Sequence, residues 1–210
     1  MDKVKTTDEG LVKMFLEGDQ DSFNMLMWRW EKPLCQFIYR MIGDQEEARD
    51  ICQESFLRAY RSLKGFRQKA KFSSWLYKIA INQCHSWGRK RKRARVVSLS
   101  EIAQGDEYAP REEREGASNS PTEASLQRRE RELIVRQALD CLPENQRLII
   151  ILKEYQGLKF SEIAQMLRRP VSTVKSRLYA GLVALSAILA SPAVQHGKSA
   201  RPQNMGGRQL

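Results

Sequence analysis

Residues 142–185 decide the fold of the C-terminal part of the chain, and they read LPENQRLIIILKEYQGLKFSEIAQMLRRPVSTVKSRLYAGLVAL. Pro143 suits the start of a helix, and the run 148–152 supplies that helix with an apolar face. Gly157 interrupts it, and the apolar spacing in FSEIAQML, residues 160–167, predicts a second, short helix.

A third helix is expected after the turn at Arg168-Arg169-Pro170, with Ser172 as its cap. Its inward positions are Val174, Leu178, Leu182 and Leu185. Its outward positions, in the part of the helix that such motifs insert into the major groove, are Thr173, Lys175, Ser176, Arg177 and Tyr179. This is the layout of a helix-turn-helix, although a plain helical hairpin with solvated basic residues would show the same pattern.

The composition restricts the class of protein. The 210 residues have room for one domain or two small ones, and 41% hydrophobic against 29% charged residues is enough for a folded core. Four cysteines without a CxxC pair and only two histidines support neither a zinc site nor a disulfide framework. Because the N-terminus lacks an apolar signal core and the longest apolar run is too short to span a bilayer, we expect a cytoplasmic protein.

The net charge of +11 is concentrated in two segments. Residues 61–95 contain 12 basic and no acidic residues, residues 171–210 contain five basic and no acidic residues, and residues 1–60 carry a net charge of −4. Two separate basic segments suggest two contacts with a polyanion, because clustered Lys and Arg release condensed counterions from phosphates. A solvated basic face is the alternative that charge alone leaves open.

Helical spacing of apolar residues also fills the N-terminal part. It predicts one helix before the break at Gly18-Asp19, a second before Pro33, and a third that begins with a capping box at Asp44 and Glu47. Since no run of strict alternation occurs, the fold class is all-α.

A stretch rich in Gly, Pro, Ser and Glu divides the chain into two small helical domains, the second a helix-turn-helix. We interpret this acidic stretch as a flexible linker and the polar C-terminus as a disordered tail. The predicted boundaries of domain, linker, domain and tail are 8–95, 96–127, 128–190 and 191–210.

The segment Gly65–Arg95 combines its unbroken positive charge with five aromatic residues. Duplex binding requires charge, but holding an unpaired strand also requires flat apolar faces on which bases stack. Asn82 is a candidate reader of base edges because its amide is both donor and acceptor, and the cluster 89–95 is a candidate for phosphate binding. Trp75 and Tyr77 could equally be ordinary core residues.

These motifs together resemble a known family. DQEEARDICQESFLRAYRSL (residues 44–63) and FRQKAKFSSWLYKIAINQC (66–84), followed by the helix-turn-helix stretch, are similar to regions 2 and 4 of bacterial sigma-70-type sigma factors. The short length, with only a linker between the two regions, resembles the extracytoplasmic-function (ECF) group. The resemblance covers residues 8–185.

The resemblance implies a role for each matched residue. The surface that docks on the β′ clamp helices of core RNA polymerase would comprise Asp50, Gln53, Glu54 and Arg58. The residues that open and hold the minus-10 element would be Phe66, Arg67, Lys71, Phe72, Trp75, Asn82 and Arg89. The helix that recognises the minus-35 element as duplex would carry Ser172, Thr173, Lys175, Ser176, Arg177 and Tyr179.

The implied partners are core RNA polymerase, at its β′ clamp helices and β flap, promoter DNA and an anti-sigma factor, with no membrane insertion. The chain departs from the family pattern at Ala180 and Ile81, where Arg is usual, and at Ser86, where Asp is usual. These departures affect the promoter sequence that is read. The apolar stretch 178–190 would either extend the core or form a surface for the anti-sigma factor.

We therefore interpret the chain as a promoter-specificity subunit that joins core RNA polymerase, reads two promoter elements, uses no metal or cofactor and catalyses no reaction. A conventional duplex-binding regulator would not account for the aromatic, basic segment upstream. A nuclease would need an acidic metal-binding cluster or a nucleophile with a base, and residues 61–95 contain no acid.

Overall fold

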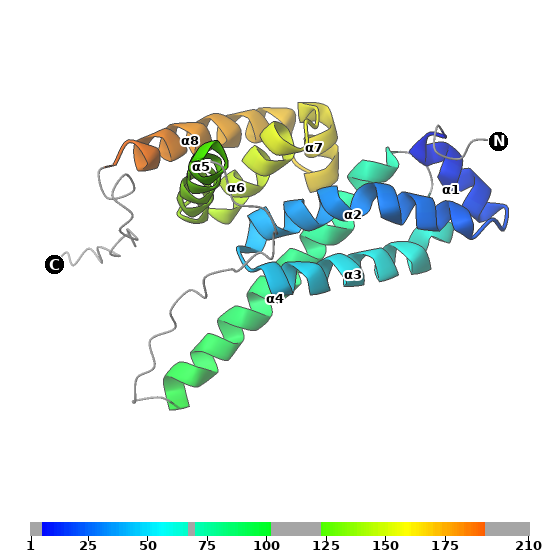
Figure 1. The fold of residues 1–210 in the computed structure, drawn as a ribbon, viewed down its shortest axis with the longest axis horizontal. Coiled ribbons are helices and arrows are strands. Elements are labelled where there is room, and N and C mark those ends of the chain that lie inside the picture. Colours follow the sequence, from blue (N-terminus) through cyan, green and yellow to red (C-terminus); the bar gives the residue numbers. More distant parts are fainter. Residues whose placement is uncertain (1–5, 67–69, 102–122, 192–210) are drawn as a thin grey trace.

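The structure is a computed structural model that describes residues 6–66, 70–101 and 123–191. All regular elements in these ranges are helices arranged in two domains, which confirms the predicted all-α class (Figure 1). None of the described helices is both long enough and apolar enough to cross a membrane.

The N-terminal domain consists of α1 (Asp8–Leu16), α2 (Asp21–Ile42), α3 (Gln45–Ser62), the 3-10 turn η2 (Leu63–Gly65) and α4 (Phe72–Glu101). α2 packs on α1, α3 and α4. The predicted break at Gly18 is confirmed, since this residue has a φ of 106° in the left-handed region. The predicted cap is confirmed too, because the Asp44 carboxylate accepts a hydrogen bond from the Glu47 backbone N–H at 3.1 Å.

The helix end predicted before Pro33 is wrong, because α2 continues through this residue to Ile42. A proline inside a helix removes one backbone hydrogen bond and costs ~3 kcal/mol. Apolar residues in the next two turns offset this cost, since each contributes ~1.5–3 kcal/mol on full burial. They are Leu34, Phe37, Ile38 and Met41.

A disulfide joins Cys35 of α2 to Cys52 of α3, so the expectation that the cysteines provide no disulfide is wrong for this pair. The two residues are 17 positions apart in the sequence. The packing of α2 against α3 brings their Cα atoms to 5.4 Å. Spacing along the sequence could not reveal the pair, because it depends on how two helices face each other.

The C-terminal domain consists of α5 (Glu123–Asp140), α6 (Glu144–Ile150), the π-helical turn η3 (Ile151–Tyr155), α7 (Phe160–Leu167) and α8 (Val171–Leu189). The break predicted at Gly157 is confirmed by its φ of 64°. α7 packs against α8 as the two helices of the predicted helix-turn-helix, and Val174 and Leu178 are buried on the inner face of α8.

The start of α8 differs from the prediction. The helix begins at Val171, directly after Pro170, and no side chain caps it. Ser172 lies in the first turn and is not the cap, because the φ of −58° at Pro170 already sets the chain for helix entry. Further along α8, Gly181 makes a close approach that no sequence pattern singled out: a Cβ atom there would lie 2.9 Å from Cδ1 of Ile150.

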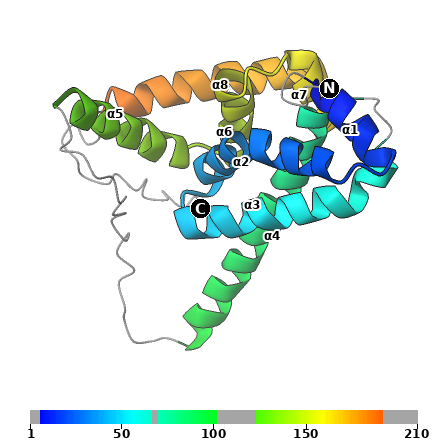
Figure 2. The same cartoon turned by 45° about the vertical axis from the view of Figure 1, so that its right-hand side comes forward.

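Helix extends into both ends of the segment assigned to the linker. α4 continues to Glu101 and α5 begins at Glu123, whereas the central part of the linker and the tail 192–210 lie outside the described residues. Figures 1 and 2 agree that the C-terminal half of α4 projects away from the other described helices. Arg89, Lys90, Lys92 and Arg93 on this part of the helix are exposed and therefore accessible to a partner.

Candidate nucleic-acid interface

The first candidate DNA surface lies on the first half of α4, whose position is set by α1. The Glu9 carboxylate accepts a hydrogen bond at 3.2 Å from the Phe72 backbone N–H and caps α4 from 63 residues upstream. Asp8 accepts a second bond, at 2.9 Å, from the indole N–H of Trp30 in α2. α1 thereby fixes the start of α4 relative to α2. Arg67, one of the predicted residues, lies outside the described residues.

The aromatic residues of this surface are less accessible than their number in the sequence suggests. Phe72 is fully buried and Phe66 is 9% exposed. Both rings pack against Trp75, with centroid separations of 5.8 and 5.0 Å. Tyr77 is buried as well, so among these four rings only the half-buried Trp75 offers part of its surface. Phe66 and Phe72 lie in the core and hold Trp75 in place.

Polar and basic side chains continue this surface along α4. Asn82 and Arg89 are both exposed. The guanidinium of Arg91 lies 5.0 Å above the ring of Trp87, a cation–π contact within the same helix. Residues 61–95 contain no acidic residue. No carboxylate within this segment therefore neutralises the positive potential of its basic side chains.

The second candidate DNA surface lies on α8, at the residues predicted for the recognition helix. Exposed on it are Ser172, Lys175, Ser176 and Tyr179, and half-buried are Thr173 and Arg177. The Ser176 hydroxyl donates to the Thr173 carbonyl at 3.1 Å, within the same helix. The Lys175 ammonium lies 5.6 Å from the centroid of the Phe160 ring, which ties this side chain to α7.

The predicted polymerase-docking residues form a stripe on the outer face of α3. Asp50, Gln53 and Arg58 are exposed, and Glu54 is half-buried and paired with Arg58 at 2.7 Å. Leu57, which the sequence analysis missed, is 50% exposed on the same stripe. Its spacing of three residues from Glu54 is the signal that could have identified it.

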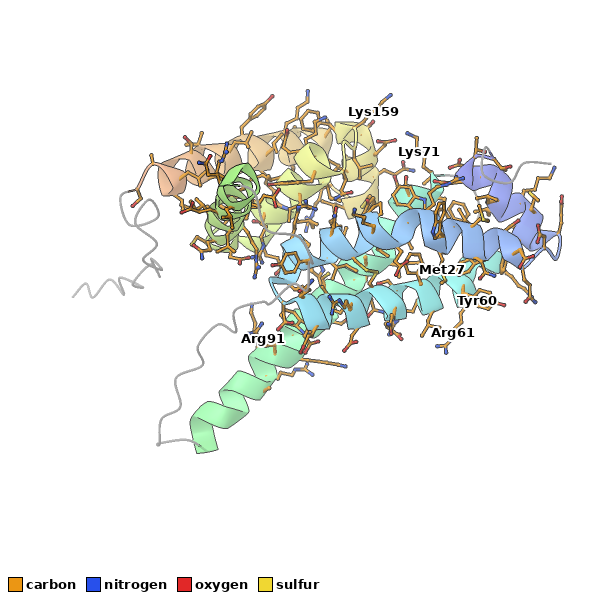
Figure 3. All side chains as sticks on the ribbon, in the orientation of Figure 1. Met27, Tyr60, Arg61, Lys71, Arg91 and Lys159 are labelled. Carbon is orange, nitrogen blue, oxygen red and sulfur yellow. A yellow bond between two sulfur atoms is a disulfide. The ribbon has the colours of Figure 1, made fainter. Side chains whose placement is uncertain are left out.

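Neighbouring residues on this side of the N-terminal domain are also exposed. Tyr60 of α3 is 43% exposed and Met27 of α2 is 40% exposed. In Figure 3, Tyr60 and Arg61 project from α3 away from the C-terminal domain. The α3 face is therefore not covered by the C-terminal domain.

One of the predicted DNA contacts is bound by the other domain. The Lys71 ammonium lies 2.7 Å from the Glu162 carboxylate in α7, and Figure 3 shows Lys71 on the side where α7 approaches the N-terminal domain. This hydrogen bond raises the pKa of Lys71 and lowers the pKa of Glu162, so both groups are charged at neutral pH. Lys71 is therefore not available to a phosphate while the pair is formed.

Further contacts join the domains around a cavity of about 600 Å³. The Tyr77 hydroxyl donates to the side-chain carbonyl of Gln156, and burial raises the pKa of Tyr77, which keeps the hydroxyl protonated as a donor. The guanidinium of Arg40 lies 4.4 Å from the centroid of the Tyr155 ring. These residues line the cavity from both sides.

Arg136 of α5 joins the C-terminal domain to the end of α2. Its guanidinium donates to the Tyr39 hydroxyl and to the carbonyl of Gly43 at the C-terminus of α2, and lies 4.4 Å from the centroid of the Tyr39 ring. A cation at a helix C-terminus also interacts favourably with the helix dipole. Arg136 is 97 positions from Tyr39 in the sequence, and no local pattern indicates this contact.

The described residues contain no group of three or more His, Cys, Asp or Glu side chains that could hold a metal ion. What they present is two basic helical surfaces, one of them on a helix-turn-helix, in an all-helical two-domain protein. This combination defines a nucleic-acid-binding protein.

Comparisons with known proteins identify the family. The Sigma-70 region 2 family profile matches residues 26–94, and the Sigma-70, region 4 profile matches residues 132–185. The RNA polymerase sigma-H factor of Pseudomonas aeruginosa PAO1 is 35% identical over 172 residues, which are 82% of this chain and 88% of the relative. The ECF RNA polymerase sigma-E factor of Escherichia coli K12 is 32% identical over 173 residues, 82% and 89% of the two chains. The chain belongs to the ECF group of the sigma-70 family, whose members direct promoter-specific transcription.

Two solved structures share the fold. The sigma factor RpoE from Bartonella quintana, in complex with the anti-sigma factor NepR, matches with a TM-score of 0.61 at 21% identity and covers 81% of this chain and 98% of RpoE. CnrH, in complex with the cytosolic domain of CnrY, matches with a TM-score of 0.62 at 23% identity and covers 87% and 96% of the two chains. Both likenesses support the two-domain helical architecture.

Proposed function

We propose that this sigma factor reads two promoter elements in different states, the minus-35 element as duplex through α8 and the minus-10 element as a melted strand through α4. The observation that carries the proposal is that exposed Asn82, half-buried Trp75 and a basic face without acids share one helix. Charge alone would bind any duplex, whereas a partly open ring and an amide can hold and read an extruded base.

The residues of α4 have different roles in binding the melted minus-10 strand. A base stacked on Trp75 gains ~1–3 kcal/mol, and the ring is kept in place by buried Phe66 and Phe72. Asn82 then reads the base edge through its donor and acceptor. Arg89 and the basic residues after it hold the backbone phosphates, in company with Arg67 and Lys71.

On α8, Lys175 and Arg177 contact phosphates of the intact minus-35 duplex, and the side chains of the first turns enter the major groove. Those side chains are Ser172, Thr173, Ser176 and Tyr179. Ala180 follows them where the family usually has Arg, so phosphate contact at this end of the surface is weaker than usual.

The outer stripe of α3 docks on the β′ clamp helices of core RNA polymerase, and Leu57 adds an apolar contact to its charged residues. The C-terminal domain contacts the β flap. In this role the protein acts in the cytoplasm and positions the polymerase while catalysing nothing itself. RpoE and CnrH were solved with NepR and CnrY bound, and an anti-sigma factor is the corresponding partner proposed for this chain.

Promoter binding requires the two domains to separate. Glu162 holds Lys71 in the structure, and Gln156 holds Tyr77 next to the surface of Trp75 and Asn82. Since Lys71 cannot pair with Glu162 and a phosphate at once, we infer that engagement of polymerase and DNA breaks these contacts.

The test is transcription in vitro with core polymerase, this protein and a promoter found by mapping start sites. Trp75→Ala should retain co-purification with core polymerase but lose strand opening, read as permanganate reactivity of promoter thymines. Lys175→Ala is the crossed control, because it should weaken binding to minus-35 duplex yet still engage a template with a pre-melted bubble. If both variants lost activity equally on the duplex promoter and on the pre-melted template, the proposed division of labour, with strand opening by α4 and duplex recognition by α8, would be contradicted.

A further inference from the structure

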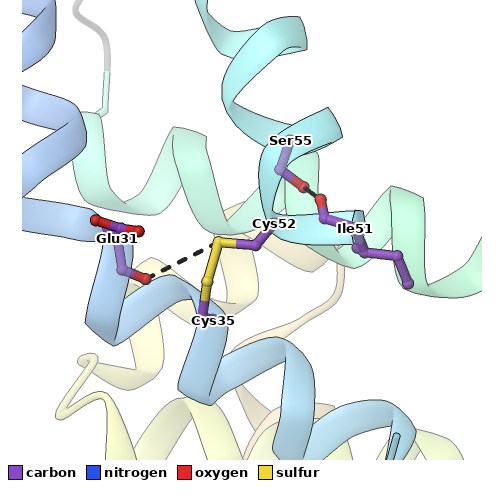
Figure 4. Close-up of a disulfide and its surroundings, with 5 residues drawn as sticks. All are labelled: Glu31, Cys35, Ile51, Cys52 and Ser55. Atoms are coloured by element: carbon purple, nitrogen blue, oxygen red, sulfur yellow. Dashed lines mark hydrogen bonds between the residues drawn. A yellow bond between two sulfur atoms is a disulfide. The ribbon is translucent and has the colours of Figure 1, made fainter. Parts of the chain in front are cut away.

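Cys35 and Cys52 lie at the seam between α2 and α3, on the inner side of the helix that carries the proposed docking stripe (Figure 4). Cys52 is only 2% exposed, whereas Cys35 is half-buried. Of the two residues, Cys35 is therefore the one that a small oxidant from solvent reaches more readily. The Cys52 sulfur is the one that stays inside and closes the bond.

The fold accommodates both the dithiol and the disulfide. The Cα atoms of the two residues are 5.4 Å apart, inside the range of about 4.4–6.8 Å in which a disulfide forms without moving the backbone. In the reduced state the Cys52 thiol has an acceptor as well, because its sulfur lies 3.9 Å from the Glu31 carbonyl oxygen. The Cα separation therefore suits the disulfide without a shift of α2 against α3.

We propose that Cys35 and Cys52 form a reversible oxidation site that cross-links α2 to α3 when the protein meets a peroxide. The Cys35 thiolate attacks one peroxide oxygen, the O–O bond breaks, and the departing hydroxide is protonated to water, which leaves a sulfenic acid on Cys35. The Cys52 thiol, held next to that sulfur by the packing of α2 against α3, then loses its proton as it attacks the Cys35 sulfur, and the sulfenic hydroxyl leaves as a second water. Two thiols have lost two protons and two electrons to one hydrogen peroxide, and a dithiol reductant returns them by exchange.

The other described thiol in the N-terminal domain does not compete for this reaction. Cys84 is buried in α4, and burial raises its pKa to about 12, so it carries almost no reactive thiolate at neutral pH. Cys141 is exposed in the turn directly after α5, in the C-terminal domain, whereas the pair joins α2 to α3 in the N-terminal domain. The disulfide therefore forms between Cys35 and Cys52 because these two residues are held close together.

The consequence for activity rests on the proposed function. A protein that works with RNA polymerase works where reductants keep thiols reduced, so the cross-link forms under oxidative stress. Both sulfurs point into the seam, while Asp50, Gln53 and Leu57 remain exposed on the other face of α3. The oxidised protein is therefore more resistant to unfolding and still docks on polymerase.

The experiment uses the full chain, reduced with dithiothreitol or treated with hydrogen peroxide. Peptide mass spectrometry is expected to find the Cys35 and Cys52 peptides linked after peroxide and separate again after dithiothreitol. In urea titrations, oxidation should lower the unfolding equilibrium constant of the N-terminal domain by roughly 30- to 1000-fold. Cys35→Ser and Cys52→Ala should show neither the linked peptide nor the shift, and Cys141→Ser, the matched control, should show both.

Failure to link under peroxide, a link that native protein does not release to dithiothreitol, or an unchanged unfolding constant would each overturn the oxidation site. Binding to immobilised core polymerase is read separately. If the reduced form binds and the oxidised form does not, the claim that the docking face stays open is wrong. If neither form binds, the proposed function fails, whereas the thiol chemistry is decided by the first measurements alone.

Discussion

Replacing Arg136 with alanine should open the two domains and strengthen binding to single-stranded minus-10 DNA. In the structure this side chain joins α5 to α2 through the Tyr39 hydroxyl, the Gly43 carbonyl and the Tyr39 ring. It touches neither candidate DNA surface. Any gain in DNA binding must therefore come from the equilibrium between closed and open forms.

The magnitude follows from the contacts that are lost. Hydrogen bonds to a charged group are worth ~1.5–3 kcal/mol when buried, and a cation–π contact adds ~0.5–1 kcal/mol. Arg136 is only half-buried, so solvent screens these contacts and we take ~1–2 kcal/mol for the whole set. That shifts the opening equilibrium by a factor of about 5–30. While the closed form dominates, the apparent affinity for a ligand of the open form rises by the same factor.

The assay is fluorescence anisotropy with a labelled single-stranded oligonucleotide of the minus-10 sequence, at fixed salt. Arg131→Ala is the matched control, because it removes the same charge from the same helix, where the side chain donates to the Gln127 carbonyl of its own turn and, among the described residues, to none in the N-terminal domain. Loss of a positive charge by itself weakens DNA binding, so a gain for Arg136→Ala has the opposite sign to the trivial effect. Equal affinities for the two variants would refute the closed form as the resting state, and so would an unchanged radius of gyration in X-ray scattering.

Four other outcomes are expected. Lys71→Ala should return the lowered pKa of the Glu162 carboxyl towards its ordinary value of 4.5, because the pair with Lys71 is intact above 4.5 and is lost as the pH falls through the lowered value. NMR titration of the Glu162 carboxyl would show this change, and an unchanged pKa would contradict the pair. Lys175→Ala should reduce the salt slope of minus-35 duplex binding by about one unit, and an unaltered slope would remove it from the phosphate contacts. Gly181→Val should destabilise the C-terminal domain by ~1–3 kcal/mol in urea, because even a Cβ atom there lies 2.9 Å from Ile150, and a neutral result would contradict the close packing. Asp50→Arg should impair association with core polymerase, and normal co-purification would argue against the α3 stripe.

The sequence predicted those features that depend on local patterning. Helical spacing of apolar residues predicted the helices. Gly18 and Gly157 marked the breaks correctly, because their φ values of 106° and 64° are left-handed conformations that glycine tolerates. Local rules failed at Pro33, where the packing of the following turns outweighs a missing hydrogen bond. They failed at Ser172 as well, because Pro170 already fixes the start of the helix.

Features of the candidate site that depend on long-range contacts could not be read from the sequence. Aromatic residues in a basic segment indicated a stacking surface, but periodicity did not show that Phe66 and Phe72 lie inside while Trp75 reaches the surface. The capping of α4 by Glu9 and the Cys35–Cys52 bond each join helices whose relative position only the folded core determines.

The kinds of contact between the domains explain why a closed form need not prevent function. The hydrogen bond from Tyr77 to Gln156 is worth ~0.5–1.5 kcal/mol and the Arg40–Tyr155 contact ~0.5–1 kcal/mol, and Lys71 is too exposed for its pair to add much. Together with Arg136, these polar contacts total only a few kcal/mol, and the apolar side chains of the core cluster that both domains share add to them. A partner bound with a dissociation constant of 1 nM supplies about 12 kcal/mol. Docking on polymerase can therefore open the domains and retain most of its affinity, while free protein keeps Lys71 away from non-promoter DNA.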